Sequence, residues 1–196
     1  MEKRQQLAAI KNYAYKIFHN DATGHDFYHM RRVARLSQEI SEEEKADPFI
    51  CETSAWLHDI GDKKLFTDPR KSIEEMENFL ESLHMSSEEI NKVKTSIRNI
   101  SFSKGAIPET IEGKIVQDAD RIDAIGAIGV ARTFAYGGAM NQLIHHDHEV
   151  ENTSIQHFYD KLLKVKGLLH TDSAKKIAMK RHIFVEEFLV QFHNEW

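Results

Sequence analysis

The sequence is short of the features that mark several classes of protein. It has one cysteine, three prolines and nine glycines in 196 residues. The single cysteine, Cys51, excludes an intramolecular disulfide and fits a reducing compartment, so we expect a cytoplasmic protein. The small share of glycine and proline excludes collagen-like and low-complexity chains. No apolar run approaches the roughly 20 residues that a membrane-spanning helix needs, so we expect no membrane partner.

The charge balance excludes a protein built to coat duplex nucleic acid. There are 26 Lys and Arg against 31 Asp and Glu, which gives a net charge of −5, and the two signs are interspersed. Such a chain lacks the basic surface that binds duplex phosphates. With 41% hydrophobic residues, a chain of 196 residues can bury a core without disulfides. Its 12 histidines are many for this length and are a first indication of metal or proton chemistry.

The apolar residues recur at spacings of three and four, and no stretch alternates with a period of two. This periodicity predicts helices and no sheet. We expect an all-α protein without internal repeats, with helices over residues 3–19, 26–44, 48–61, 73–83, 87–100, 108–136, 153–166 and 172–192.

Three of these helices have recognisable start signals. Asp47 stands before a proline, which is typical of a helix N-terminus. Ser72 and Ser86 are each followed three residues later by glutamate, the pattern of a capping box. In the most apolar segment, 108–136, Gly126 and Gly129 indicate either close helix packing or a bend.

The polar residues with the strongest chemical signal stand near helix ends and in this apolar segment. His58 and Asp59 end the third expected helix, and His29 lies one helix earlier. Three carboxylates follow in the apolar segment: Asp118, Asp120 and Asp123. A buried carboxylate is costly unless it is paired or coordinates a metal. Two histidines and two carboxylates would form a mixed nitrogen and oxygen site, which suits a divalent transition metal better than Mg²⁺.

The motifs around these residues resemble the HD-domain metal-dependent phosphohydrolases. The similar segments are 24–33 (GHDFYHMRRV), 55–62 (AWLHDIGD) and 118–127 (DADRIDAIGA), and the end of the chain, 181–192, resembles the small bacterial members. The resemblance implies an all-α, HD-domain helical bundle. It also implies one domain over 1–196, with metal-site helices over roughly 20–136 and C-terminal helices over 153–193 that pack on them.

The same resemblance implies the metal ligands. The family signature H…HD…D falls on His29, His58, Asp59 and Asp120, and an Ala-Asp-Arg tripeptide selects Asp120 as the fourth ligand. The residues between Asp59 and Asp120 include a single histidine, in an expected loop, so we expect one bound ion. We expect a divalent transition metal, Mn²⁺ first, with Ni²⁺, Co²⁺, Fe²⁺, Zn²⁺ or Mg²⁺ as alternatives.

Phosphoryl chemistry at such a site needs further groups. A divalent ion lowers the pKa of a bound water molecule and polarises a phosphoryl oxygen. Asp62, four residues after His58, is the candidate to orient or deprotonate that water. Asp59 is also predicted to be a catalytic residue. Asp62 could instead be an ordinary carboxylate at the helix end. Lys63, four residues after Asp59, is a candidate to bind phosphate, although a Lys-Lys pair is usually solvated. Arg98 and Lys104 are weaker candidates.

Three residues near the ligands are further candidates to bind substrate: His25, Arg32 and Asp123. Arg32 and Asp123 lie on the same helix faces as His29 and Asp120. Arg32 could instead pair with Asp123, and Asp123 could support a ligand from behind. Asp118 should face elsewhere, as a solvated or capping carboxylate.

We therefore expect a hydrolase that acts on nucleotides. The resemblance favours cleavage of nucleoside triphosphates to a monophosphate and pyrophosphate through a metal-activated water. A 5′-nucleotidase-type phosphomonoesterase is the first alternative, and a non-catalytic helical binding or regulatory module is the second. The expected partner is a small nucleotide, with the protein a monomer or homodimer.

Overall fold

Helices make up all the regular secondary structure of the computed structural model, over the residues that it describes, 1–21, 24–98, 100 and 106–196. No strand occurs among these residues, so the predicted all-α class is confirmed. None of the described helices is both long and apolar enough to span a membrane. In chain order the elements are α1 (Lys3–Phe18), α2 (Phe27–Glu43), α3 (Pro48–Leu57), α4 (Pro69–Ser82), α5 (Ser87–Ile97), α6 (Ile111–Asp123), α7 (Gly126–Ala139), α8 (Ser154–Asp160), the 3₁₀ helix η2 (Leu162–Leu168) and α9 (Asp172–Glu195).

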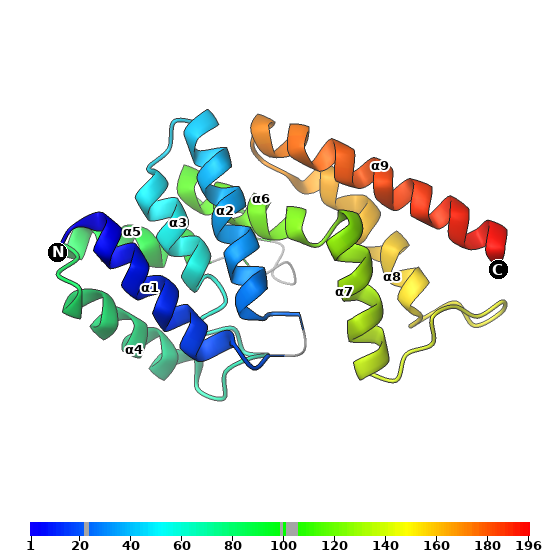
Figure 1. Ribbon diagram of the computed structural model, residues 1–196, viewed down its shortest axis with the longest axis horizontal. Coiled ribbons are helices and arrows are strands. Elements are labelled where there is room, and N and C mark those ends of the chain that lie inside the picture. The colour runs from blue at the N-terminus through cyan, green and yellow to red at the C-terminus, as the bar shows by residue number, and fades with distance from the viewer. Residues whose placement is uncertain (22–23, 99, 101–105) are drawn as a thin grey trace.

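Helix α6 lies at the centre of the molecule, with α1–α5 on one side and α7–α9 on the other (Figure 1). It packs against α2, α3 and α5, and also against α7 and α9. Fully buried side chains such as Met30, Ile50, Ile115 and Ile122 fill the space between α2, α3 and α6. Polar residues on α6 can therefore meet both halves of the fold.

Two predicted helix starts have different outcomes. The capping box of α5 is confirmed, because the Glu89 amide donates to Ser86 Oγ at 3.2 Å and the Ser86 amide donates to Glu89 Oε2 at 2.9 Å. The box predicted at Ser72 is wrong. Helix α4 begins four residues earlier than predicted, at Pro69, because Asp68 accepts the amide of Lys71 at 3.1 Å and so caps the first turn.

The segment predicted as one long helix, 108–136, is two helices. The chain is extended at Ile125, and Gly126 has a φ of +79°, a conformation that side chains with a Cβ rarely adopt. A Cβ added at Gly126 would also lie 3.1 Å from Cβ of Arg181 on α9. Both alternatives therefore hold at Gly126, where the chain bends and α9 packs closely. The segment predicted as one helix over 153–166 is likewise divided, into α8 and η2.

A sharp turn follows α3 and fixes the position of the His58-Asp59 doublet. His58 is the C-cap of α3, and Gly61 has a φ of +82°. A Cβ added at Gly61 would come within 2.8 Å of the Ile73 side chain on α4. The chain therefore turns immediately after the doublet, which leaves His58 and Asp59 at the helix end, facing α2 and α6.

The start of α9 is bound by two carboxylates from other helices. Asp118 on α6 is fully buried and accepts the amides of His170 and Thr171 at 2.9 and 2.8 Å, together with the Thr171 hydroxyl at 2.8 Å. Glu44, after α2, accepts the amide and hydroxyl of Ser173 at 3.0 and 2.6 Å. The expectation of a solvated Asp118 is therefore wrong and that of a capping Asp118 is correct.

Candidate metal centre

The four predicted metal ligands come together from α2, the end of α3, and α6. Asp120 Oδ1 lies 3.4 Å from Nε2 of His29 and 3.8 Å from Nε2 of His58. The two oxygens of Asp59 lie 3.9 Å from His29 Nε2 and 3.4 Å from His58 Nε2. The two carboxylates therefore face the same pair of ring nitrogens.

Both ring nitrogens are buried without a hydrogen-bond partner in the described structure. His29 is fully buried and His58 is 6% exposed, and Nε2 of each ring is unsatisfied. Their Nδ1 atoms are bound elsewhere, to the Asp123 carboxylate and to the carbonyl oxygen of Ala55, both at 2.8 Å. Because both partners can only accept, Nδ1 must carry the proton in each neutral ring. The lone pairs of both Nε2 atoms then point at Asp59 and Asp120, as metal ligation requires.

Asp123 supports the His29 ring from the side away from the cluster. It is fully buried, and Arg32 donates to both its oxygens, at 2.7 and 3.0 Å. Arg132 donates to Oδ2 at 2.8 Å and to the carbonyl oxygen of Gly24 at 2.7 Å. Burial alone would raise the pKa of Asp123, but the hydrogen bonds from His29 and Arg32 outweigh it and keep the carboxyl pKa well below its usual range. Asp123 therefore stays ionised and fixes the orientation of His29.

Burial has the opposite effect on the histidine itself. Desolvation lowers the pKa of His29, and the bond to Asp123 compensates only in part. The ring is thus neutral at neutral pH, which is the form that binds metals. For Asp59, burial would raise the carboxyl pKa, but the neighbouring His58 and His25 lower it below its usual range, so Asp59 is ionised.

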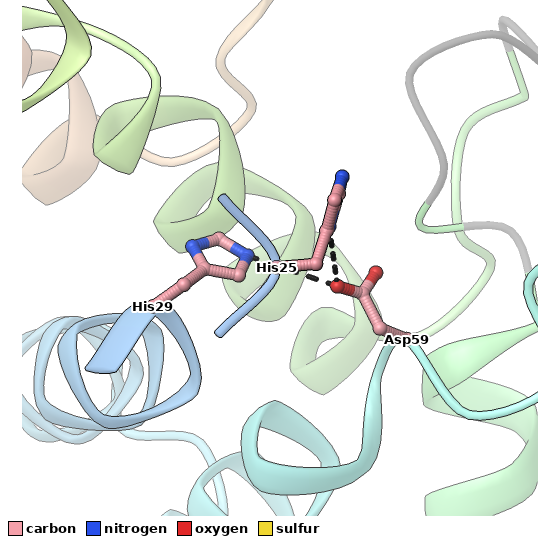
Figure 2. A group of neighbouring side chains, drawn as sticks. All are labelled: His25, His29 and Asp59. Carbon is pink, nitrogen blue, oxygen red and sulfur yellow. Dashed lines mark hydrogen bonds and ion pairs between the residues drawn. The ribbon is translucent and has the colours of Figure 1, made fainter. Parts of the chain in front are cut away.

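His25 joins the cluster through Asp59. Its Nδ1 lies 2.8 Å from Asp59 Oδ2, and Figure 2 shows the interactions that link Asp59 to both His25 and His29. The hydrogen bond to Asp59 raises the pKa of His25, although partial burial opposes the change. His25 therefore orients the Asp59 carboxylate and presents the rest of its ring to the adjoining cavity.

The arrangement fits a divalent metal ion. Atoms that share one ion at about 2.0–2.2 Å lie no more than about 4.4 Å apart. The four distances from the Nε2 atoms to the carboxylate oxygens, 3.4–3.9 Å, are within this limit. An ion would also satisfy the two unpartnered Nε2 atoms. The donor set of two imidazoles and two carboxylates is typical of transition-metal sites.

Two cavities open at the cluster. The large cavity, of about 640 Å³, includes in its lining His58, Asp62, Ile73, Asn91, Thr95 and Arg98. The small cavity, of about 190 Å³, includes in its lining His25, Lys64, Asp120, Arg121, Arg132 and Lys161. Asp59 and Asp62 line both cavities. The candidate metal centre is therefore reachable from two sides.

The remaining predicted site residues are placed differently. Asp62 is half-buried beside the cluster and accepts the amide of Lys64 at 2.8 Å. Lys63, expected to bind substrate, is exposed and lies outside the lining of both cavities, whereas Lys64 lines the small one. Lys104, a weaker candidate, lies outside the described residues.

Arg32 and Asp123 were expected to bind substrate, with a structural role as the alternative for each. They pair with each other, and Asp123 is fully buried behind His29. Neither residue lines the two cavities. These contacts favour the structural alternatives left open for both residues, in which Arg32 pairs with Asp123 and Asp123 supports the His29 ring.

Three cations of the small cavity were not singled out from the sequence: Arg121, Arg132 and Lys161. Arg132 is the only charged residue of α7, and an isolated charge in an apolar helix is a signal that could have identified it. Arg121 follows Asp120 directly in the sequence. Lys161 sits at the end of α8 among other charged residues, and no sequence pattern distinguishes it.

Comparisons with known proteins agree with this site. The HD domain family model matches residues 26–125, a range that contains all four candidate ligands. The uncharacterised protein YpgQ of Bacillus subtilis (strain 168) is 39% identical over 199 residues, covering 100% of this chain and 96% of YpgQ.

Solved structures are similar over the whole chain. The crystal structure of Bacillus subtilis YpgQ in complex with ADP has a TM-score of 0.88 and 37% identity, covering 100% of this chain and 97% of that one. An HD-superfamily hydrolase from Bacillus thuringiensis has a TM-score of 0.84 and 42% identity, covering 100% and 98%. The chain therefore belongs to the HD-domain phosphohydrolase superfamily.

Proposed function

We propose that this hydrolase cleaves nucleoside triphosphates to a nucleoside monophosphate and pyrophosphate, with one divalent transition metal, Mn²⁺ first among the candidates. The observation that carries the proposal is the pair of buried, unpartnered Nε2 atoms facing two carboxylates beside a cavity lined by cations. The complex of the similar YpgQ protein with ADP supports a nucleotide as substrate.

The residues of the site would have separate roles in the reaction. His29, His58, Asp59 and Asp120 would hold the ion. When bound, the ion would supply a water molecule of lowered pKa and polarise a phosphoryl oxygen. The positive side chains that line the small cavity, Lys64, Arg121, Arg132 and Lys161, would bind phosphate oxygens and oppose the negative charge of the substrate.

Asp62 is proposed to accept the proton of the attacking water. It lies three residues beyond Asp59, lines both cavities and is held in the turn by its bond to the Lys64 amide. Asp62→Asn is nearly isosteric, so we expect metal affinity to persist while turnover falls about 10²–10⁴-fold. If metal affinity fell instead and excess metal restored turnover, Asp62 would be a supporting residue. Unchanged turnover would exclude the catalytic role.

The function is tested by a screen of nucleotides on protein stripped with a chelator. Each nucleotide is incubated with Mn²⁺, Mg²⁺, Co²⁺ or Ni²⁺, and both pyrophosphate and orthophosphate are measured. Pyrophosphate released from triphosphates would support the proposal. Orthophosphate released from nucleoside monophosphates would favour the phosphomonoesterase, and no product with any metal would favour a regulatory module.

A further inference from the structure

The two cavities differ in chemistry and meet at the candidate metal centre. Asp59 and Asp62 line both. Of the other ligands, His58 lines only the large cavity and Asp120 only the small one. An ion held by these residues would therefore lie at the junction. A phosphorus atom undergoing attack must lie at the same place, so the two sides of the substrate would extend into different cavities.

The small cavity has an excess of positive charge once a metal is bound. Four cations line it, against the carboxylates of Asp59, Asp62 and Asp120. A divalent ion would offset the two carboxylates that hold it, and Arg132 is paired with Asp123 at 2.8 Å. Asp62 then stands against three further cations, Lys64, Arg121 and Lys161. The positive side chains of this cavity also repel one another. Burial lowers the pKa of Lys161, and the charges of Arg132 and Lys64 lower it further, while Asp120 opposes them. Cations gathered in this way are stabilised by a polyanion.

Lys161, at the end of α8, is a lining residue of the small cavity that comes from the C-terminal helices. Lys161 is the C-cap of α8, where the chain leaves the α-helix and begins η2. It is half-buried, and Val165 of η2 lines the cavity beside it. The elements α8 and η2 thus contribute to the site without supplying a predicted metal ligand.

Fewer charged residues line the large cavity, namely Asp59, Asp62, Lys94 and Arg98. Ile60, Ile73 and Ile97 line it together with the neutral polar side chains of Asn91 and Thr95. One of its cations, Lys94, is already paired with Glu77 at 2.7 Å. Its volume of about 640 Å³ is in the range of small-molecule pockets, about 300–1,000 Å³. The three isoleucines, with one amide and one hydroxyl side chain beside them, suit a base and a sugar better than a chain of phosphates.

We propose that the small cavity binds the pyrophosphate leaving group, with Lys161 as a principal ligand, and that the large cavity binds the nucleoside. The assignment rests on the proposed function and deepens it. The α-phosphorus then lies at the junction. The water oxygen bonds to it, and the bond to the bridging oxygen breaks, with its electron pair on pyrophosphate. One water proton passes through Asp62 to solvent. Because the nucleoside and the pyrophosphate occupy different cavities, the bond that breaks is the one between the α-phosphorus and the bridging oxygen.

The test measures binding of two probes, inorganic pyrophosphate and AMP, by calorimetry on stripped protein and again at a fixed excess of Mg²⁺. Lys161→Met should weaken pyrophosphate binding about tenfold or more, because hydrogen bonds to charged groups contribute about 1.5–3 kcal/mol. It should change AMP binding less than threefold. Lys164→Met is the matched control, since Lys164 lies three residues on, is exposed and does not line the small cavity.

The reciprocal variant is Asn91→Ala, at an exposed position on α5, which should weaken AMP and leave pyrophosphate unchanged. Circular dichroism verifies that each variant folds. The opposite pattern, equal loss of both probes, or no binding of either would overturn the assignment. Failure of the proposed function looks different, because wild-type protein would then release no pyrophosphate from any triphosphate, whatever the two variants bind.

Discussion

Helix α6 buries two aspartates, one in its middle and one at its C-terminal end, and the surroundings of the two differ. Asp118 and Asp123 are five residues apart, and both are fully inaccessible to solvent. At Asp123 the donors are side chains that can carry charge, from His29, Arg32 and Arg132. Asp118, in the middle of the helix, instead accepts main-chain amides and a hydroxyl at the start of α9.

The comparison shows that burial of a carboxylate does not by itself indicate catalysis. An aspartate that satisfies the amides of a helix start has a structural role, because those amides otherwise lack partners. An aspartate that binds a histidine ring controls which ring nitrogen is free to act. Asp120 lies between them, is 24% exposed and reaches the candidate metal centre. One helix therefore carries three aspartates in three different environments.

The largest effect is expected at Asp120 and at His58. Asp120→Ala and His58→Ala should each reduce turnover below detection, because each removes a candidate ligand of the single ion. Far-ultraviolet circular dichroism should remain close to that of the wild type. Substantial turnover in both variants at saturating metal would place the active site elsewhere and remove the contrast with Asp118.

A smaller loss is expected at Asp123. Asp123→Asn should weaken metal binding about 10–100-fold, the usual result when a partner of a ligating histidine is replaced. Excess metal should restore part of the turnover, because His29 itself is unchanged. Metal titrations followed by turnover measure both effects. If affinity and turnover stayed at wild-type values, Asp123 would be no more functional than Asp118.

Asp118→Asn should affect stability and leave the chemistry intact. The amide retains one oxygen but places a donor group toward the main-chain amides of His170 and Thr171. We expect the free energy of unfolding to fall by about 1–3 kcal/mol, as for a buried group left unsatisfied. Metal affinity and turnover per folded molecule should match the wild type. Denaturant unfolding and activity on the same preparation test both parts, and a selective loss of turnover would contradict the structural role.

The smallest effect concerns Glu44, the second carboxylate at the start of α9. Hydrogen bonds from Ser173 hold the pKa of Glu44 below its usual range. Because the folded pKa is depressed, its contribution to stability is present above the unfolded pKa of about 4.3 and is lost as the pH falls through the folded value. The difference in Tm between wild type and Glu44→Gln should thus shrink from pH 6 to pH 3. A difference that is constant with pH would exclude this origin.

The periodicity of the sequence predicted most of the helices. Where the helices begin and end depends on which residue caps the first turn and on contacts with other helices. Apolar residues at spacings of three and four predicted α1 and α2 to within one residue at each end, whereas α3 ends at Leu57, four residues before the predicted end. At α4, a capping aspartate before a proline, Asp68, prevailed over Ser72. The break at Gly126 depends on the close approach of Arg181 from α9, a tertiary contact that periodicity does not contain.

The sequence likewise predicted one part of the candidate site and missed another. The family motifs identified four residues that the structure brings together, and their role as ligands stays a prediction. The motifs did not identify Arg132 and Lys161, which lie outside the matched range of 26–125. These cations reach the site because α7 and α8 pack beside α6, so only the folded chain relates them to the ligands.

The separation of the ligands along the chain has a thermodynamic consequence. The candidate ligands His29 and Asp120 come within 3.4 Å of each other although they are 91 positions apart in the sequence (120 − 29). An unfolded chain cannot keep such groups together, so an ion that fits the cluster binds the native state almost exclusively. Each fitting ion must then raise the melting temperature, by an amount that follows its affinity. At a concentration one hundred times the Kd, the added stability is about 2.7 kcal/mol. A ranking of divalent ions by thermal shift would therefore identify the preferred metal before any substrate is known.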